Sequence, residues 1–135
     1  MTVLVDTSAF VILVDPDNDQ HGRATDVLEQ VRDDRIGLVT HEYIVVETIA
    51  LLQRRIGLTA VGHFVGELLP LVETIWVDPE LHRSARDALL ATGRRRFSFV
   101  DWTSFLAMRR LGITTAFAFD ADFATQGFEV MPTLP

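Results

Sequence analysis

Val3-Leu4-Val5-Asp6-Thr7-Ser8-Ala9-Phe10 joins an apolar run to an acid, two hydroxyls and a second apolar stretch. Its three leading apolar residues stand almost at the start of the sequence and are mostly β-branched, which predicts a short buried strand. The strand meets a carboxylate and two hydroxyls, and the apolar stretch 9–14 that follows predicts a helix. Asp6 is therefore expected at the carboxyl end of a strand, the edge where open α/β sheets bind ligands.

Length and composition are typical of a globular domain. The 135 residues predict a single domain spanning 1–135, and a hydrophobic content of 48% argues against disorder. The absence of cysteine excludes disulfides, thiol catalysis and thiolate zinc sites. No apolar run reaches the roughly 18 residues of a membrane span, and no basic segment precedes the first apolar stretch. We therefore expect a cytoplasmic protein without a membrane partner.

The charge of the chain limits how it could hold a polyanion. Its formal net charge of −7 argues against binding nucleic acid through bulk charge alone. The sequence contains no lysine, which excludes mechanisms that depend on one, such as Schiff bases and P-loops. Arginine clusters could contact phosphates locally, although solvated helix ends also explain them. These clusters lie at 54–55, at 109–110 and in a predicted basic loop, Arg94, Arg95 and Arg96.

Strands and helices alternate along the rest of the chain. Hydrophobic periodicity and turn residues predict strands near 36–39, 74–77, 115–119 and 128–131, and helices near 20–32, 41–55, 59–69, 79–92 and 98–111. This alternation predicts an α/β fold, a three-layer α/β/α sandwich with a central parallel sheet of four to five strands. Thr40 and Asp78 are expected to cap the helices that follow them.

Three acidic residues on or before helices have competing explanations. Asp6 could cap the next helix, and Asp101 follows Ser98 at the spacing of a capping box, which is a structural explanation. Glu47 is harder to explain, because its helical neighbours three and four positions away are largely apolar and burying an unpaired carboxylate is costly. Either an arginine from 94–96 pairs with Glu47, or the carboxylate has a function.

Two further acids complete a possible cluster. Asp120 and Asp122 follow the fourth predicted strand, where one cap does not account for two neighbouring like charges. Asp6 and Asp120 would end strands that could be neighbours at the switch point of the sheet, and Glu47 and Asp101 would lie on helices entered from the same edge. Converging carboxylates without histidine or cysteine indicate Mg²⁺ or Mn²⁺, which would activate water and stabilise charge on a phosphate.

Other polar and aromatic residues rank lower as site candidates. Thr7 and Ser8 could orient water at the metal or only cap the helix. The histidines at 21, 41, 63 and 82 lack metal-ligand spacing, so we expect them on the surface. Trp76 and Trp102 are expected to be packing residues.

Taken in order, these residues resemble the motifs of a known family. The opening Val3 to Ser8 is similar to that of a PIN domain, and the similarity covers nearly the whole chain. Four segments follow in the order and spacing of VapC-type toxins, namely Val46-Glu47-Thr48, Ser98-Phe99-Val100-Asp101-Trp102, Ala118-Phe119-Asp120-Ala121-Asp122-Phe123 and Gly127-Phe128. Ala118 departs from the pattern, because many members carry a hydroxyl residue there that would serve a hydrogen bond near Asp120.

The resemblance implies a Mg²⁺-dependent endoribonuclease, the toxin of a VapBC toxin–antitoxin pair. Its motifs make Asp6 and Asp101 the main metal ligands, with Glu47 and Asp120 completing the acidic pocket and Asp122 assisting through water. It further implies a homodimer and a VapB antitoxin whose C-terminal segment enters the active-site groove. The implied targets are structured RNAs, such as tRNA or the ribosomal sarcin–ricin loop.

Other classes of protein also carry an acidic site of this kind. A phosphatase with an aspartyl nucleophile would need a second acid where Ser8 stands, and both it and a receiver domain would need a lysine. A catalytically inactive PIN-like module that binds RNA or protein would keep the acidic pocket without cleaving RNA. Mg²⁺-dependent RNA cleavage separates this module from the nuclease.

Overall fold

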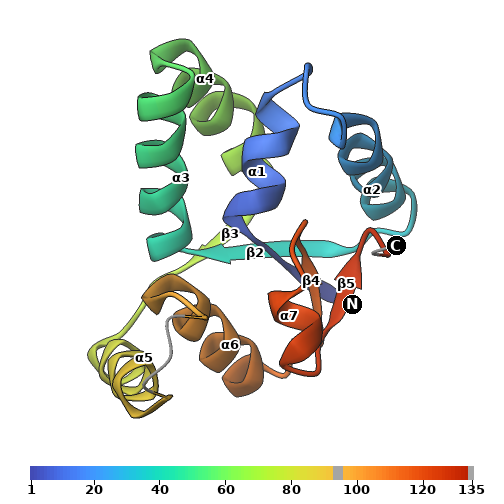
Figure 1. Cartoon of the computed structure of the whole chain (residues 1–135). Coiled ribbons are helices and arrows are strands. Elements are labelled where there is room, and N and C mark those ends of the chain that lie inside the picture. The colour runs from blue at the N-terminus through green and yellow to red at the C-terminus, as the bar shows by residue number, and fades with distance from the viewer. Residues whose placement is uncertain (93–95, 134–135) are drawn as a thin grey trace.

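The computed structural model describes residues 1–92 and 96–133 (Figure 1). In chain order its elements are β1 (Thr2–Val5), α1 (Thr7–Val14), α2 (His21–Asp33), β2 (Gly37–His41), α3 (Glu42–Arg55), α4 (Leu58–His63), the π-helical turn η1 (Phe64–Leu68), the 3₁₀ turn η2 (Leu69–Leu71), β3 (Glu73–Ile75), α5 (Pro79–Thr92), α6 (Phe99–Leu111), β4 (Thr115–Phe117), α7 (Asp122–Thr125) and β5 (Glu129–Met131). The predicted alternation of strands and helices is confirmed.

The strands of the described chain form one parallel sheet in the order β3-β2-β1-β4-β5. β1 lies at the centre and pairs with both β2 and β4, so the strand order reverses on either side of it. The predicted neighbourhood of the first and fourth strands is confirmed. The amide of Asp6 extends this pairing by donating to the carbonyl of Phe117 at 3.0 Å. The carboxyl ends of β1 and β4 therefore meet at the switch point, where such sheets bind ligands.

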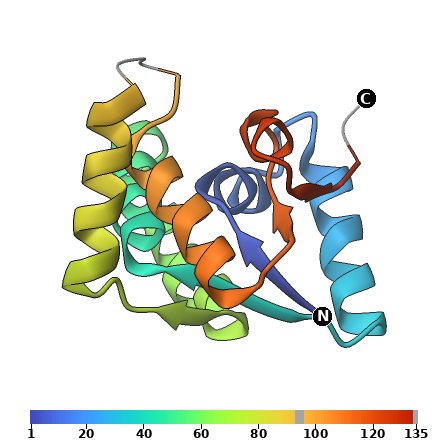
Figure 2. The same cartoon turned by 90° about the horizontal axis from the view of Figure 1, so that it is seen from below.

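Helices cover both faces of the sheet, as predicted for the three-layer sandwich. Figure 1 shows α1, α3 and α4 above the sheet and α5, α6 and α7 below it. Figure 2 shows α5 beside α6 at one end of the molecule and α2 at the other. In the described part of the chain, no helix is both long and apolar enough to cross a membrane.

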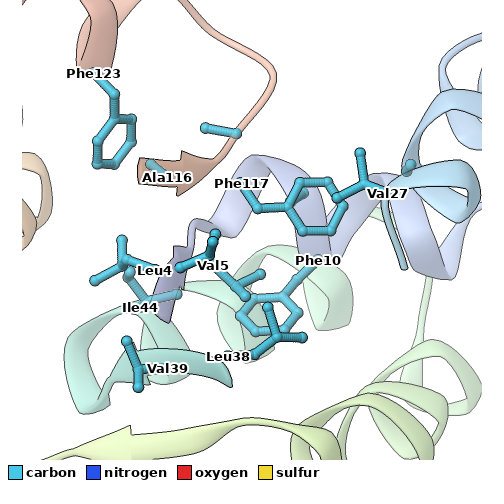
Figure 3. Packing of buried hydrophobic residues seen from close by; sticks show 14 of the residues in the cluster. Leu4, Val5, Phe10, Val27, Leu38, Val39, Ile44, Ala116, Phe117 and Phe123 are labelled. Carbon is cyan, nitrogen blue, oxygen red and sulfur yellow. The ribbon is translucent and has the colours of Figure 1, made fainter. Parts of the chain in front are cut away.

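The core lies on both sides of β1, which explains its unbroken apolar run. Val3, Leu4 and Val5 are at most 1% exposed, because a central parallel strand is buried on both faces. Neighbouring strands add apolar side chains to this core (Figure 3). Phe10 packs edge-to-face on Phe64, with 4.9 Å between the ring centroids. This packing fixes where β1 ends and so where Asp6 stands.

Three local predictions differ from the structure. The predicted helix 59–69 breaks into α4, η1 and η2, because Pro70 lacks an amide hydrogen and its ring conflicts with the preceding helical turn. Trp76 was expected to pack but is 72% exposed, since β3 ends one residue before it at the sheet edge. Thr40 does not cap α3, because its hydroxyl donates to the carbonyl of Val5. The side chain of His41 caps the helix instead.

Two other local predictions agree with the structure. The Asp78 side chain accepts a hydrogen bond from the amide of Leu81 at 2.8 Å, so Asp78 caps α5 as expected. Trp102 packs edge-to-face against Phe97 and Phe105, with 5.7 Å between ring centroids in both pairs. The tryptophan thus belongs to the aromatic packing around α6.

Candidate active site

A cavity of about 440 Å³ opens at the carboxyl edge of the sheet, beside the ends of β1 and β4. It is lined by every predicted acid and by both predicted hydroxyl residues, that is by Asp6, Thr7, Ser8, Glu47, Asp101, Asp120 and Asp122. These residues come from four separate parts of the sequence. The fold therefore brings the predicted site residues to one place.

Asp6 is both the cap of helix α1 and a residue that lines the cavity. Its Oδ2 atom accepts hydrogen bonds from the amide of Ser8 at 3.2 Å and from the Ser8 hydroxyl at 2.7 Å, so Asp6 caps α1. The residue is only 5% exposed and still lines the cavity. The pKa of Asp6 is raised to about 7, mainly by burial and also by the negative charges of Asp120 and Asp101, against the opposing hydrogen bonds from Ser8.

Ser8 and Thr7 hold the site together through hydrogen bonds. The Ser8 hydroxyl donates to Asp6 and accepts from the amide of Phe119 at 3.0 Å, which ties the start of α1 to the segment that carries Asp120. The buried Thr7 hydroxyl accepts from the hydroxyl of Thr48 on α3 at 3.3 Å. Both residues thus position the acids, and their role in orienting water stays a prediction.

Asp101 is both a helix cap partner and a cavity residue. Its Oδ2 atom accepts from the amide of Ser98 at 2.9 Å, and its own amide donates to the Ser98 hydroxyl at 3.0 Å, which completes the predicted capping box. The carboxylate is half-buried, and burial followed by the charge of Asp122 raises its pKa. The capping box orients the side chain and leaves it facing the cavity.

Asp120 and Asp122 line the cavity from the segment that follows β4. The Oδ1 atom of Asp120 accepts from the amide of Asp122 at 3.0 Å. Burial raises the pKa of Asp120, and the charges of Asp122 and Asp101 add to this effect. The hydrogen bond explains how two neighbouring acids are held in place, and the mutual repulsion shows that a counter-charge would stabilise them.

Glu47 lines the cavity from α3 and is partly buried. In the described part of the chain it forms none of the ion pairs. Of the arginines proposed to pair with it or to contact RNA, Arg94 and Arg95 lie outside the described residues. Arg96 does not line the cavity, and its guanidinium lies over the ring of Phe97 at 5.4 Å.

The donor atoms of the cavity suit a hard divalent cation. Asp6, Asp101 and Asp120 each use one carboxylate oxygen for a hydrogen bond that fixes the side chain, and the other oxygen has no protein donor among the described residues. In the same residues, no three acids or histidines are arranged so that they could hold a metal ion together. Mg²⁺ fits such an open arrangement, because it keeps several waters and takes only one or two carboxylates directly.

His41 is a structural residue that the sequence analysis placed wrongly on the surface. It is fully buried between α3 and α6. Its Nδ1 atom accepts from the amide of Ile44, and its Nε2 atom lies 2.8 Å from the hydroxyl of Ser104, which itself donates to the carbonyl of Val100. This pattern requires a neutral ring with hydrogen on Nε2. The ring thereby links the helix that carries Glu47 to the helix that carries Asp101.

We expect His41 to lower the free energy of unfolding as the pH drops from 6.5 towards 4, against the opposite effect of Asp6, whose pKa is raised. Burial lowers the pKa of His41 to about 4, so the unfolded chain binds a proton that the folded chain excludes. Urea unfolding at several pH values should show that the free energy of unfolding of His41→Gln rises relative to that of the wild type as the pH falls from 6.5 to 4. The exposed His63→Gln is the control, and equal changes in both variants would contradict this assignment.

Comparison with known proteins places the fold and the site in a family. The sequence profile of the PIN domain matches residues 3–129. The chain belongs to the PIN-domain family. The matched region of this PIN domain contains every carboxylate that lines the cavity. PIN domains are nucleases and generally use a divalent metal, in agreement with the hard donors found here.

Two relatives of this PIN domain come from Mycobacterium tuberculosis. The 23S rRNA-specific endonuclease VapC20, in strains H37Rv and CDC 1551, is 36% identical over 132 residues, which cover 96% of this chain and 98% of the relative. The crystal structure of VapC20, described as a sarcin–ricin loop cleaving toxin, matches with a TM-score of 0.79 and 32% identity over 93% of this chain and 95% of that chain.

A more distant structure shows the fold alone. FitAcB from Neisseria gonorrhoeae covers 96% of each chain with a TM-score of 0.68 but is only 15% identical. The architecture of the PIN domain is thus retained where most side chains differ.

Proposed function

We propose that this chain is a Mg²⁺-dependent endoribonuclease toxin of a VapBC-type toxin–antitoxin system. Its substrate would be a structured RNA, either rRNA at the sarcin–ricin loop or tRNA, and its cleavage would inhibit translation. The observation that carries this proposal is the convergence of five carboxylates in one cavity at the switch point of a PIN domain. Identity of 36% to a 23S rRNA-specific endonuclease, over nearly all of both chains, favours rRNA as the substrate.

The residues of the cavity take separate roles in this proposal. Asp6 and Asp101 would be the main direct ligands of Mg²⁺ or Mn²⁺ through their free carboxylate oxygens, with Asp120 and Asp122 contributing to the metal site through water. A divalent cation in this position lowers the pKa of water and neutralises charge on a phosphodiester. Glu47 would complete the acidic pocket from α3, and Thr7 and Ser8 would keep the acids and water oriented.

The proposed partners follow from the similarity to VapC-type toxins. The chain would be inhibited by a VapB-type antitoxin whose C-terminal segment enters the cavity, and it would act as a homodimer. RNA must be held by local arginines, because the chain as a whole carries a net charge of −7. Arg94, Arg95 and Arg96 remain candidates for this contact.

The decisive experiment is cleavage of RNA by the purified protein. Total rRNA, tRNA and a sarcin–ricin-loop hairpin would be incubated with the protein and Mg²⁺, and new 5′ ends would be mapped. Discrete ends in one of these RNAs would support the nuclease. Binding of RNA without cleavage would instead favour the catalytically inactive PIN-like module.

Removal of divalent metal should abolish this cleavage. EDTA is expected to lower the rate to background, and Mg²⁺ or Mn²⁺ should restore it. Ionised carboxylates repel one another and the RNA phosphate, so a cation must neutralise their charge before the phosphate can enter the cavity. Mg²⁺ should also raise the melting temperature of the wild-type protein, since ligands that bind only the folded state stabilise it. Full activity in excess EDTA would contradict the metal-dependent mechanism.

A further inference from the structure

The wall of the cavity that α3 forms has a feature that metal binding does not use. Glu47, Leu51 and Arg55 are spaced by four residues, so they lie on one face of α3, and all three line the cavity. Of the described residues that line it, Arg55 is the one with a positive charge. The wall therefore changes from acidic to apolar to basic along the helix.

The geometry of the helix sets the distance between the two charged ends of this wall. Eight residues at a rise of 1.5 Å place the backbone of Arg55 about 12 Å along the axis from Glu47. Helical side chains lean towards the N-terminus, so the guanidinium of Arg55 reaches back over the cavity. Arg55 and the acids thus line one cavity, with Arg55 at the C-terminal end of the α3 wall.

The surroundings of Arg55 suit a phosphate better than a structural ion pair. Among the described residues, Arg55 takes part in none of the ion pairs or side-chain hydrogen bonds. Val11 of α1 and Leu51 also line the cavity and form an apolar part of its wall. Arg55 is solvent-exposed, so a phosphate at this edge of the cavity can reach its guanidinium. Guanidinium groups bind phosphate oxygens in a bidentate manner.

We propose that Arg55, with the apolar wall formed by Val11 and Leu51, is a binding subsite for an RNA phosphate that flanks the cleaved bond. The subsite rests on the proposed nuclease function and adds a substrate contact to it. Arg55 thereby offsets the repulsion between the acidic cavity and the RNA backbone and sets the direction in which the strand enters. Arg54 provides a matched control, because it carries the same charge in the same helical turn but does not line the cavity.

The kinetic test compares Arg55→Gln, Arg55→Lys and Arg54→Gln on a sarcin–ricin-loop hairpin with Mg²⁺. We expect Arg55→Gln to raise KM about tenfold with little change in kcat, because a phosphate contact acts on binding. Arg55→Lys should recover part of the affinity, and Arg54→Gln should match the wild type. Equal effects of Arg54→Gln and Arg55→Gln, or a loss confined to kcat, would overturn the subsite.

A binding test separates this inference from the proposed cleavage. Affinity for the same hairpin would be measured by fluorescence anisotropy in the Asp6→Asn background, with and without Arg55→Gln or Arg54→Gln. Arg55→Gln should reduce the slope of log affinity against log salt by about 1, and Arg54→Gln should leave it unchanged. Binding that depends on Arg55 without any wild-type cleavage would overturn the nuclease and keep the subsite. Wild-type cleavage together with binding that does not depend on Arg55 would keep the nuclease and overturn the subsite. Absence of cleavage and of any dependence on Arg55 would overturn both proposals.

Discussion

Asp6→Asn should reduce RNA cleavage by at least about a thousandfold while leaving the fold intact. The substitution preserves the shape of the side chain and an oxygen that can accept from the amide and hydroxyl of Ser8, so α1 keeps its cap. It removes the negative charge at the centre of the cavity, next to Asp101 and Asp120. Cleavage rates with Mg²⁺ would be compared with those of Asp19→Asn, which makes the same change at an exposed position.

Stability provides an independent readout for the same variant. Because burial raises the pKa of Asp6 to about 7, the folded state loses stability relative to the unfolded chain as the pH rises from about 4 to about 7, and the loss is constant above that range. In metal-free buffer at pH 8, Asp6→Asn should therefore melt at a higher temperature than the wild type. The gain should vanish near pH 4, and Mg²⁺ should stabilise the wild type but not the variant. An active Asp6→Asn protein would contradict the proposed mechanism.

Asp101→Asn should also remove most cleavage. A second substitution, Ser98→Ala, tests whether the loss of helix capping could be the cause. The asparagine keeps an oxygen for the amide of Ser98 but loses the charge that faces the cavity. We expect a fall in rate of about a hundredfold or more with a small change in melting temperature. Activity and thermal unfolding would be measured on the same preparations.

Ser98→Ala is the matched variant for the capping box. It removes the hydroxyl that accepts from the amide of Asp101, which should cost about 1 kcal/mol of stability. The amide of Ser98 still donates to Asp101, so the carboxylate keeps its place and most activity should remain. If Ser98→Ala were as inactive as Asp101→Asn, the role of Asp101 would be structural alone.

The overall architecture was predictable because its signals are local. The apolar run 3–5, its flanking Asp6 and the alternation of strand and helix patterns led to a parallel sheet with helices on both faces, which the structure confirms. The boundary errors come from residues with competing local preferences. Helix 59–69 was predicted as one piece although Pro70 lies just beyond it, and Pro70 instead ends the helix in the turns η1 and η2.

The candidate site was predictable in its membership but not in its connections. Glu47 attracted attention because an acid on an apolar helix face is costly, and the structure places it in the cavity. Nothing in the sequence indicates that Ser8 joins Asp6 to the amide of Phe119, since these residues are far apart in the chain. The spacing of four residues from Glu47 to Leu51 and from Leu51 to Arg55 places Arg55 on the same helix face as Glu47. The sequence alone did not distinguish Arg55 from the other arginine clusters, which were also expected at helix ends or in loops.

The local sequence was sufficient to predict which carboxylates belong to the site, which strands end beside them and which helices carry them. These properties depend on side-chain chemistry and on periodicity over a few residues. The tertiary structure decided that Asp6 and Asp101 serve as cap residues and as cavity residues at once, because a carboxylate has two oxygens and the fold uses only one. It also decided that His41 is buried and that Arg55 lines the cavity, since burial and convergence arise only when distant segments pack together.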